Sequence, residues 1–124
     1  MKKRVLIVDD ALFMRNYIRG ILERIDFEVC GEASSAPEAV ERYKELKPDI
    51  VTMDIIMPEI ENLDGVGAVK KILNLDPKAN IIVISAVGEE PVVKEALASG
   101  AKSFLVKPFK PERLIDVMKS LFKT

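Results

Sequence analysis

Five short apolar segments, spaced about 20 to 30 residues apart, constrain the fold of this chain more than any other feature of its sequence. In four of them the apolar residues are nearly continuous and do not alternate with polar ones. Such runs are typical of strands that are buried on both faces of a parallel sheet. We therefore predict five parallel strands, at residues 4–8, 27–31, 50–53, 81–84 and 103–106.

Each apolar segment is followed by residues whose apolar side chains recur at the spacing of a helix. These predicted helices have their apolar faces within residues 14–25, 39–46, 66–73, 92–97 and 114–121. Regular alternation of strands and helices predicts the α/β class. We expect a single flavodoxin-like, doubly wound domain over residues 1–124, with a five-stranded parallel sheet in the order 2-1-3-4-5 and five helices.

Composition excludes several classes of function. The chain has no histidine, which removes Ser-His and Cys-His dyads and histidine-ligated zinc, and its one cysteine cannot form an internal disulfide. The 19 basic residues nearly balance the 20 acidic ones, so the net charge favours no nucleic-acid partner. No apolar run approaches the ~20 residues of a membrane span, and the N-terminus lacks the pattern of a signal peptide. We therefore expect a cytoplasmic protein without a membrane partner.

Ionisable or hydroxyl side chains stand at the predicted carboxyl ends of four strands. They are Asp9 and Asp10, Asp54, Ser85 and Lys107. In a doubly wound sheet, ligands bind outside the carboxyl ends of the strands, near the point where the strand order reverses. Because strands 1 and 3 are neighbours in the expected order, their three acids should lie close together.

Each of these residues also has an ordinary structural explanation. Asp9 or Asp10 could cap the first helix, Asp54 could accept hydrogen bonds from loop amides, and Lys107 with its following proline could form a turn. One helix cap explains one acid, however, and not three that repel one another. A hard cation with oxygen ligands relieves that repulsion, and Mg²⁺ is favoured because proteins usually hold it by a few carboxylates, phosphate oxygens and water.

A carboxylate beside Mg²⁺ can attack phosphorus and form an acyl phosphate. Asp54 is the best candidate for this nucleophile because it lies between the acid pair and the side that carries Ser85 and Lys107. Asp9 and Asp10 would then hold the metal, while Ser85 and Lys107 could interact with phosphoryl oxygens.

The motifs VLIVDDALFMR, PDIVTMDIIMPE, IIVISA and GAKSFLVKPF, in this order and spacing, resemble those of a response-regulator receiver domain. The likeness covers essentially all 124 residues and is closest to the single-domain regulators of chemotaxis. It implies that Asp54 is the phosphoacceptor, that Asp9 and Asp10 with Asp54 and the backbone carbonyl of Ile56 bind Mg²⁺, and that Ser85 and Lys107 contact the phosphoryl group.

The same resemblance implies how the domain signals. Ser85 and Phe104 would act as a conformational switch, and the bond between Lys107 and Pro108 would be cis. The output surface would be formed by helix 4, strand 5 and helix 5, including Val93, Lys94, Phe104, Lys110 and Lys119. Because the chain ends soon after helix 5, we expect it to act in trans.

The resemblance also implies the partners. A sensor histidine kinase would donate the phosphoryl group, a motor-switch or adaptor protein would receive the signal, and a phosphatase could remove the group. The domain would therefore be a signalling protein and not a conventional enzyme, with Mg²⁺-dependent self-phosphorylation and slow self-dephosphorylation.

Two features depart from the usual family pattern. The stretch after Asp54 fits only if residues 61–63 are inserted, either as a tolerated surface loop or as an element that tunes the choice of partner. Ile56 and Val87 are apolar where many relatives carry polar groups that orient a hydrolytic water. We therefore expect slow loss of the phosphoryl group.

Three alternatives differ in class. The first is a phosphorelay intermediate, which would pass the phosphoryl group to another histidine protein. The sequence poorly distinguishes such an intermediate from a motor regulator. An aspartyl-nucleophile phosphatase would need an acid two residues after Asp54, where this chain has Ile56. A nucleotide-binding module would need more than the glycines at positions 65 and 67.

Overall fold

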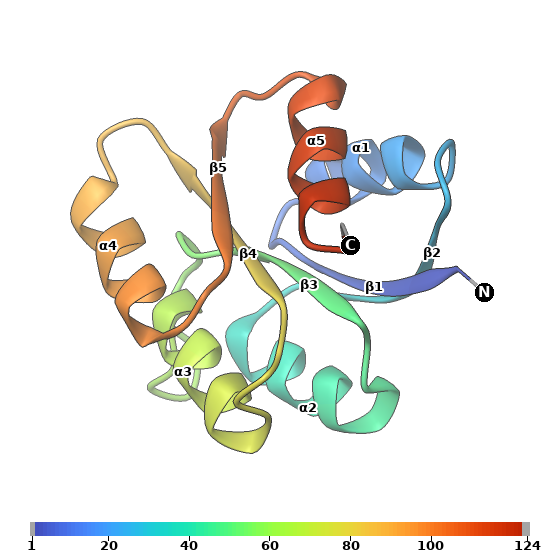
Figure 1. The fold of residues 1–124 in the computed structure, drawn as a ribbon. Helices are drawn as coiled ribbons and strands as arrows, with labels where there is room; N and C mark the ends of the chain where they lie inside the picture. Colours follow the sequence, from blue (N-terminus) through green and yellow to red (C-terminus); the bar gives the residue numbers. More distant parts are fainter. Residues whose placement is uncertain (1, 123–124) are drawn as a thin grey trace.

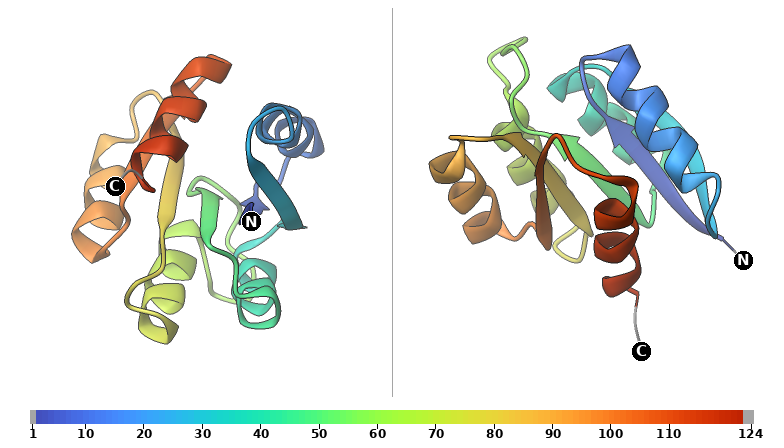
Figure 2. Two further views of the ribbon diagram at one scale, coloured as in Figure 1. Left: turned by 45° about the vertical axis from the view of Figure 1, so that its right-hand side comes forward. Right: turned by 90° about the horizontal axis from the view of Figure 1, so that it is seen from above.

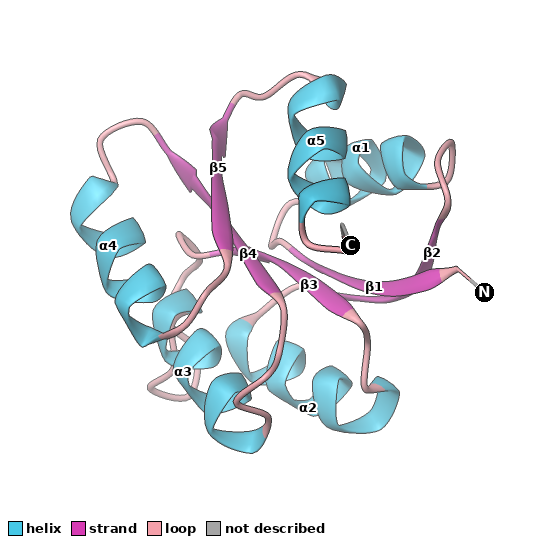
Figure 3. Cartoon of the chain, viewed as in Figure 1, coloured by secondary structure: helices cyan, strands magenta, loops and turns pink. Residues whose placement is uncertain are grey.

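The computed structural model describes residues 2–122, which form one five-stranded parallel sheet with helices on both faces (Figures 1 and 3). The strand order is β2-β1-β3-β4-β5, as the sequence predicted. The strands are β1 (Lys3–Val8), β2 (Phe27–Ala33), β3 (Ile50–Asp54), β4 (Ile81–Ala86) and β5 (Ser103–Lys107). The helices are α1 (Leu12–Leu22), α2 (Ala36–Leu46), α3 (Gly65–Leu75), α4 (Glu90–Ser99) and α5 (Pro111–Ser120).

Two apolar cores, one on each face of the sheet, explain the continuous apolar runs in the central strands. Along β1, Val5 and Ile7 pack in the core beneath α1 and α5, whereas Leu6 and Val8 pack in the core beneath α2 and α3. Successive residues of a strand point to opposite faces of the sheet. Because helices cover both faces, all four of these side chains are buried. Figure 2 shows the sheet enclosed between the two helical layers.

The prediction of burial on both faces is wrong for β5. This strand lies at the edge of the sheet, where Phe104 and Val106 remain 39% and 37% exposed. Only Leu105 of these three is buried, against the core of α1 and α5. The apolar run at residues 103–106 therefore reflects a half-covered edge strand and not a central one.

Helix ends in this fold follow from local sequence. The Ser35 hydroxyl accepts a hydrogen bond from the Glu38 amide at the start of α2, and the Asp64 carboxylate accepts one from the Gly67 amide at the start of α3. Gly100 ends α4 with a φ of 123°, a conformation that favours glycine. Among the described residues, no helix is long and apolar enough to cross a membrane.

Candidate functional site

The three acids predicted from the sequence meet at the carboxyl edge of β1 and β3. Asp9 directly follows β1. Asp54 is the last residue of β3, which ends one residue later than predicted. Val8 lies opposite Met53, so the two acids leave neighbouring strands side by side. One carboxylate oxygen of each acid, including Asp10, lies within 4.8 Å of the others. Asp9 and Asp54 are buried and Asp10 is exposed.

Lys107 joins this cluster from the end of β5. Its Nζ donates to Oδ2 of Asp9 at 2.9 Å and to Oδ2 of Asp54 at 3.3 Å. The bond between Lys107 and Pro108 is cis, as expected. A single ammonium group therefore bridges two buried carboxylates that come from different strands. One positive charge against three negative charges leaves the cluster suited to a divalent cation.

Burial and charge act in opposite directions on this cluster. Burial, followed by repulsion from Asp9, raises the pKa of Asp54 to about 6, although the Ile56 amide and Lys107 both favour the ionised form. Burial lowers the pKa of Lys107, but its contacts with Asp9 and Asp54 outweigh this and raise the pKa above the ordinary value. The lysine is therefore charged at neutral pH, while Asp54 is held in an unfavourable ionised state.

The ordinary structural explanations account for only part of this arrangement. Within the described residues, α1 begins after Ala11 with no side-chain cap, so neither Asp9 nor Asp10 serves as its N-cap. Asp9 does accept a hydrogen bond from the Ala11 amide at 2.9 Å, and Asp54 accepts one from the Ile56 amide at 3.0 Å. One oxygen of each carboxylate thus holds its own loop, and the other faces Lys107.

Ser85 and Phe104 line one apolar hollow. Ser85 lies in β4, one residue before its end, and is buried. Among residues 2–122, its hydroxyl has no hydrogen-bond partner. The hollow has a volume of about 320 Å³ and lies between β4, α4 and β5. A buried hydroxyl without a partner is costly, so Ser85 can gain stability from a new acceptor near Asp54.

One residue expected on the output surface lies elsewhere. Val93 is buried, because it points from α4 into the core shared with α3. It lines the same hollow as Phe104. Lys94, Lys110 and Lys119 are exposed, as predicted.

The connection between β3 and α3, which contains the insertion, is an ordered turn. Ile60 and Leu63 form an antiparallel bridge with two backbone hydrogen bonds of 3.0 and 2.9 Å. Glu61 and Asn62 between them have φ values of 53° and 61°, as in a type I′ turn. At the end of this connection, Gly65 lies close against the backbone of Ile55. A larger residue does not fit there, because a Cβ atom at position 65 would lie 2.5 Å from the Cα of Ile55. Figure 2 (right) shows this green loop projecting beyond the sheet.

Comparison with known proteins agrees with this geometry. The family model for the response regulator receiver domain matches residues 5–119. The chain belongs to this family. It is 54% identical to the chemotaxis protein CheY of Thermotoga maritima over 99% of this chain and all of that protein. It is 49% identical to CheY of Bacillus subtilis, over 95% of this chain and 96% of that protein.

A solved structure of a relative adds the likeness of the fold. In the CheX–CheY–BeF₃–Mg²⁺ complex from Borrelia burgdorferi, the similar chain superimposes with a TM-score of 0.90 and 37% identity. The match covers 98% of this chain and 90% of that chain. This chain is thus a receiver domain homologous to CheY, with the flavodoxin-like fold that the sequence predicted, and it is a signalling protein.

The donor set of the cluster fits a hard divalent metal. The three carboxylates offer only oxygen ligands, and the exposed Asp10 leaves the cluster open toward solvent. Asp9, Asp10 and Asp54 are therefore positioned to bind a metal ion.

Two charged residues beside the acids, Arg15 and Glu32, were not predicted from the sequence. Arg15 donates from Nη1 to the backbone carbonyl of Asp9 at 2.7 Å and from Nε to Glu32 at 2.8 Å. No pattern in the sequence pairs a residue of the first helix with one of the second strand. Only the folded chain brings Arg15 to the loop that carries the acids.

Proposed function

We propose that this chain is a phosphorylation-activated response regulator of a two-component chemotaxis system, acting in the cytoplasm, with residues 1–124 as its receiver domain. A CheA-like sensor histidine kinase phosphorylates Asp54. The observation that carries this proposal is the convergence of Asp9, Asp10, Asp54 and Lys107 at one sheet edge. The full-length likeness to chemotaxis CheY proteins supports the assignment of the pathway.

In the proposed reaction, Oδ2 of Asp54 attacks the phosphorus of a phosphohistidine on the kinase. A phosphorus–oxygen bond forms, the phosphorus–nitrogen bond breaks, and the histidine nitrogen keeps the electron pair. Oδ1 of Asp54 stays bonded to the Ile56 amide, which orients the carboxylate for attack. Although burial and repulsion from Asp9 raise the pKa of Asp54 to about 6, the carboxylate remains ionised at neutral pH and can act as the nucleophile.

Mg²⁺ is the proposed cofactor. The carboxylates of Asp9, Asp10 and Asp54 and the carbonyl of Ile56 would hold it, and when bound it offsets negative charge on the transferring group. Lys107 serves the same purpose, because its ammonium group already contacts the Asp54 oxygen that attacks. These positive charges together favour phosphoryl transfer, which depends mainly on positioning and charge stabilisation.

Phosphorylation reaches the output surface through Ser85 and Phe104. The phosphoryl group brings nearly two negative charges and new acceptor oxygens, which attract the unpartnered hydroxyl of Ser85. Phe104, now 39% exposed, can then bury its ring in the adjoining hollow. Shifting the population from 1% to 99% active takes about 5.5 kcal/mol. A motor-switch or adaptor protein reads the repacked α4–β5–α5 surface, and a phosphatase can end the signal.

A phosphotransfer experiment tests this function. Purified, radiolabelled CheA-type kinase is mixed with the chain, and label is followed on both proteins. We expect rapid, Mg²⁺-dependent transfer to the chain and none to Asp54→Asn. Failure of all CheA-type donors would contradict the chemotaxis assignment. Rapid onward transfer to an added histidine phosphotransfer protein would instead identify a phosphorelay intermediate.

The apolar side chains near the site predict slow dephosphorylation. Ile56 and Val87 are 43% and 78% exposed, and neither can orient a water for attack on the phosphoryl group. We expect the phosphoryl group to last much longer than seconds, as measured by loss of radiolabel. Ile56→Asn should shorten the lifetime at least about tenfold, since an oriented water reacts faster. Ile56→Leu is the control that should not. A lifetime of seconds in the unaltered chain would refute this prediction.

The insertion should affect partners more than chemistry. Residues 61–63 lie in the projecting turn, and the contact of Gly65 with the Ile55 backbone lies outside the deleted segment. Deleting residues 61–63 should leave the rate of phosphorylation by acetyl phosphate within about threefold, because loop length has a small entropic cost. Transfer from the kinase should change more, with Asn62→Gly as a control that keeps the turn. A collapse of the acetyl phosphate rate would show that the turn belongs to the reaction site.

A further inference from the structure

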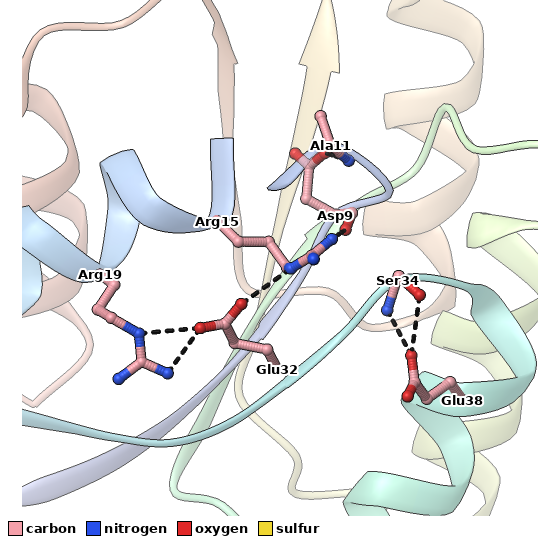
Figure 4. Close-up of polar contacts among 7 residues, drawn as sticks. All are labelled: Asp9, Ala11, Arg15, Arg19, Glu32, Ser34 and Glu38. Atoms are coloured by element: carbon pink, nitrogen blue, oxygen red, sulfur yellow. Dashed lines mark hydrogen bonds and ion pairs between the residues drawn. The ribbon is translucent and has the colours of Figure 1, made fainter. Parts of the chain in front are cut away.

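Arg15 links the loop that carries the acids to the neighbouring strand β2. Its side chain is only 15% exposed, which is unusual for an arginine on the first helix of a domain. Nη1 donates to the Asp9 carbonyl oxygen at 2.7 Å, and Nε donates to Oε1 of Glu32 at 2.8 Å. Figure 4 shows Arg15 lying between Asp9 and Glu32, with Arg19 on the other side of Glu32.

The carbonyl that Arg15 contacts belongs to the peptide unit between Asp9 and Asp10. Because a peptide unit is planar, a hydrogen bond to its oxygen restricts both ψ of Asp9 and φ of Asp10. The amide nitrogen of Asp9 is held as well, since it donates to the Ala33 carbonyl at 3.0 Å. The backbone of Asp9 is thus tied to β2 on both sides, directly through Ala33 and indirectly through Arg15 and Glu32.

Glu32 holds Arg15 in this position. Its Oε1 accepts from Arg15, and its Oε2 accepts from Nε and Nη2 of Arg19 at 2.9 and 2.6 Å. Partial burial raises the pKa of Glu32, but the bonds from the two arginines outweigh it and hold the pKa below the ordinary value. The ionised carboxylate keeps the Arg15 guanidinium beside the backbone carbonyl of Asp9.

We propose that Arg15 is a positioning residue that fixes the peptide unit between Asp9 and Asp10 and so sets their carboxylates for a divalent cation. This inference rests on the proposed function, because it concerns the metal that phosphorylation of Asp54 requires. It assigns Glu32 a supporting role, as the residue that orients Arg15.

The test compares the Mg²⁺ affinity of two variants that remove the same charge. Arg15→Ala removes the contact with the Asp9 carbonyl, whereas Arg19→Ala keeps it, although both arginines bind Glu32. Charge alone predicts tighter Mg²⁺ binding by Arg15→Ala, because a cation near the acids is lost. Positioning predicts weaker binding by about tenfold, as for other residues that orient metal ligands. Arg19→Ala should stay within about twofold of the unaltered chain.

Magnesium chloride is titrated into each protein, and backbone amide NMR shifts at the carboxyl edge give the dissociation constant without any phosphodonor. Thermal unfolding in EDTA checks that each variant is folded. If Arg15→Ala does not fold, Arg15→Lys is compared with Arg19→Lys, and it should bind Mg²⁺ more weakly by about threefold. If the Arg15 variant binds Mg²⁺ as tightly as the unaltered chain, or more tightly, the positioning role of Arg15 is overturned and the proposed function is not. Absence of saturable Mg²⁺ binding in the unaltered chain overturns the proposed function as well.

Discussion

Replacing Lys107 with methionine should lower the unfolding free energy of the metal-free chain by about 3 kcal/mol at pH 7 and slow phosphorylation of Asp54 about 100-fold. The first effect follows from burial. Asp9 and Asp54 are almost fully inaccessible to solvent, and Lys107 is the cation that contacts both carboxylates. Without it, two buried negative charges face each other with no compensating charge. The second effect follows because the lysine contacts the attacking oxygen.

The stability effect should depend on pH and on metal. At pH 5 the loss should be smaller, because the pKa of Asp54 is already raised to about 6 and the removal of Lys107 raises it further. Excess Mg²⁺ should also reduce the loss, by supplying the missing positive charge. Urea unfolding followed by circular dichroism measures both effects. Lys110→Met, an exposed lysine three residues away, is the control and should change stability by less than about 0.5 kcal/mol. Equal losses for both variants would contradict the prediction.

The conservative variant Asp54→Asn should stabilise the metal-free chain by about 3 kcal/mol at pH 7.5, although it abolishes phosphorylation. Burial, with repulsion from Asp9, raises the pKa of Asp54 to about 6 from an ordinary value of 3.8. The neutral amide avoids this cost, can still accept the hydrogen bond from the Ile56 amide, and leaves the contact between Lys107 and Asp9 in place.

The stability difference between the unaltered chain and Asp54→Asn should depend on pH. Between pH 3.8 and about 6 the folded chain binds more protons at Asp54 than the unfolded chain does, so the unfolding free energy falls as the pH rises through this window. The advantage of Asp54→Asn should therefore be near zero at pH 3, grow to nearly its full value by about pH 6.5 and then stay constant. Urea unfolding of both proteins in EDTA across this range measures the difference. A difference independent of pH would contradict the proposed cause. Excess Mg²⁺ should reverse the order of stability.

Much of the fold could be predicted from the sequence because apolar patterning and strand–helix alternation are local signals. The central strands β1, β3 and β4 are buried on both faces, and their sequences show this directly. The error at β5 arose because an edge strand that is half covered can be as apolar as a central one. Phe104 and Val106 are apolar and exposed, so their sequence gives no sign of their position at the edge.

The candidate site was predictable where topology alone brings residues together. Asp9, Asp54 and Lys107 each stand at the end of a strand, and parallel strands have their carboxyl ends at one edge. Side-chain direction was less predictable. Val93 belongs to the apolar face predicted within residues 92–97 and is buried in the core, so the helical spacing was the correct guide and its assignment to the output surface was not. The contact between Arg15 and the Asp9 carbonyl depends on β2 as well as α1, so no local pattern could reveal it.

In the proposed function, a cluster of acids around a divalent cation lets Asp54 carry a phosphoryl group. Intact mass spectrometry after incubation with acetyl phosphate tests it most directly, because a small donor needs no protein partner. We expect a gain of about 80 Da with Mg²⁺, no gain in EDTA and no gain for Asp54→Asn. An equal adduct in EDTA, or one that persists in Asp54→Asn, would show that Asp54 does not carry a metal-dependent phosphoryl group.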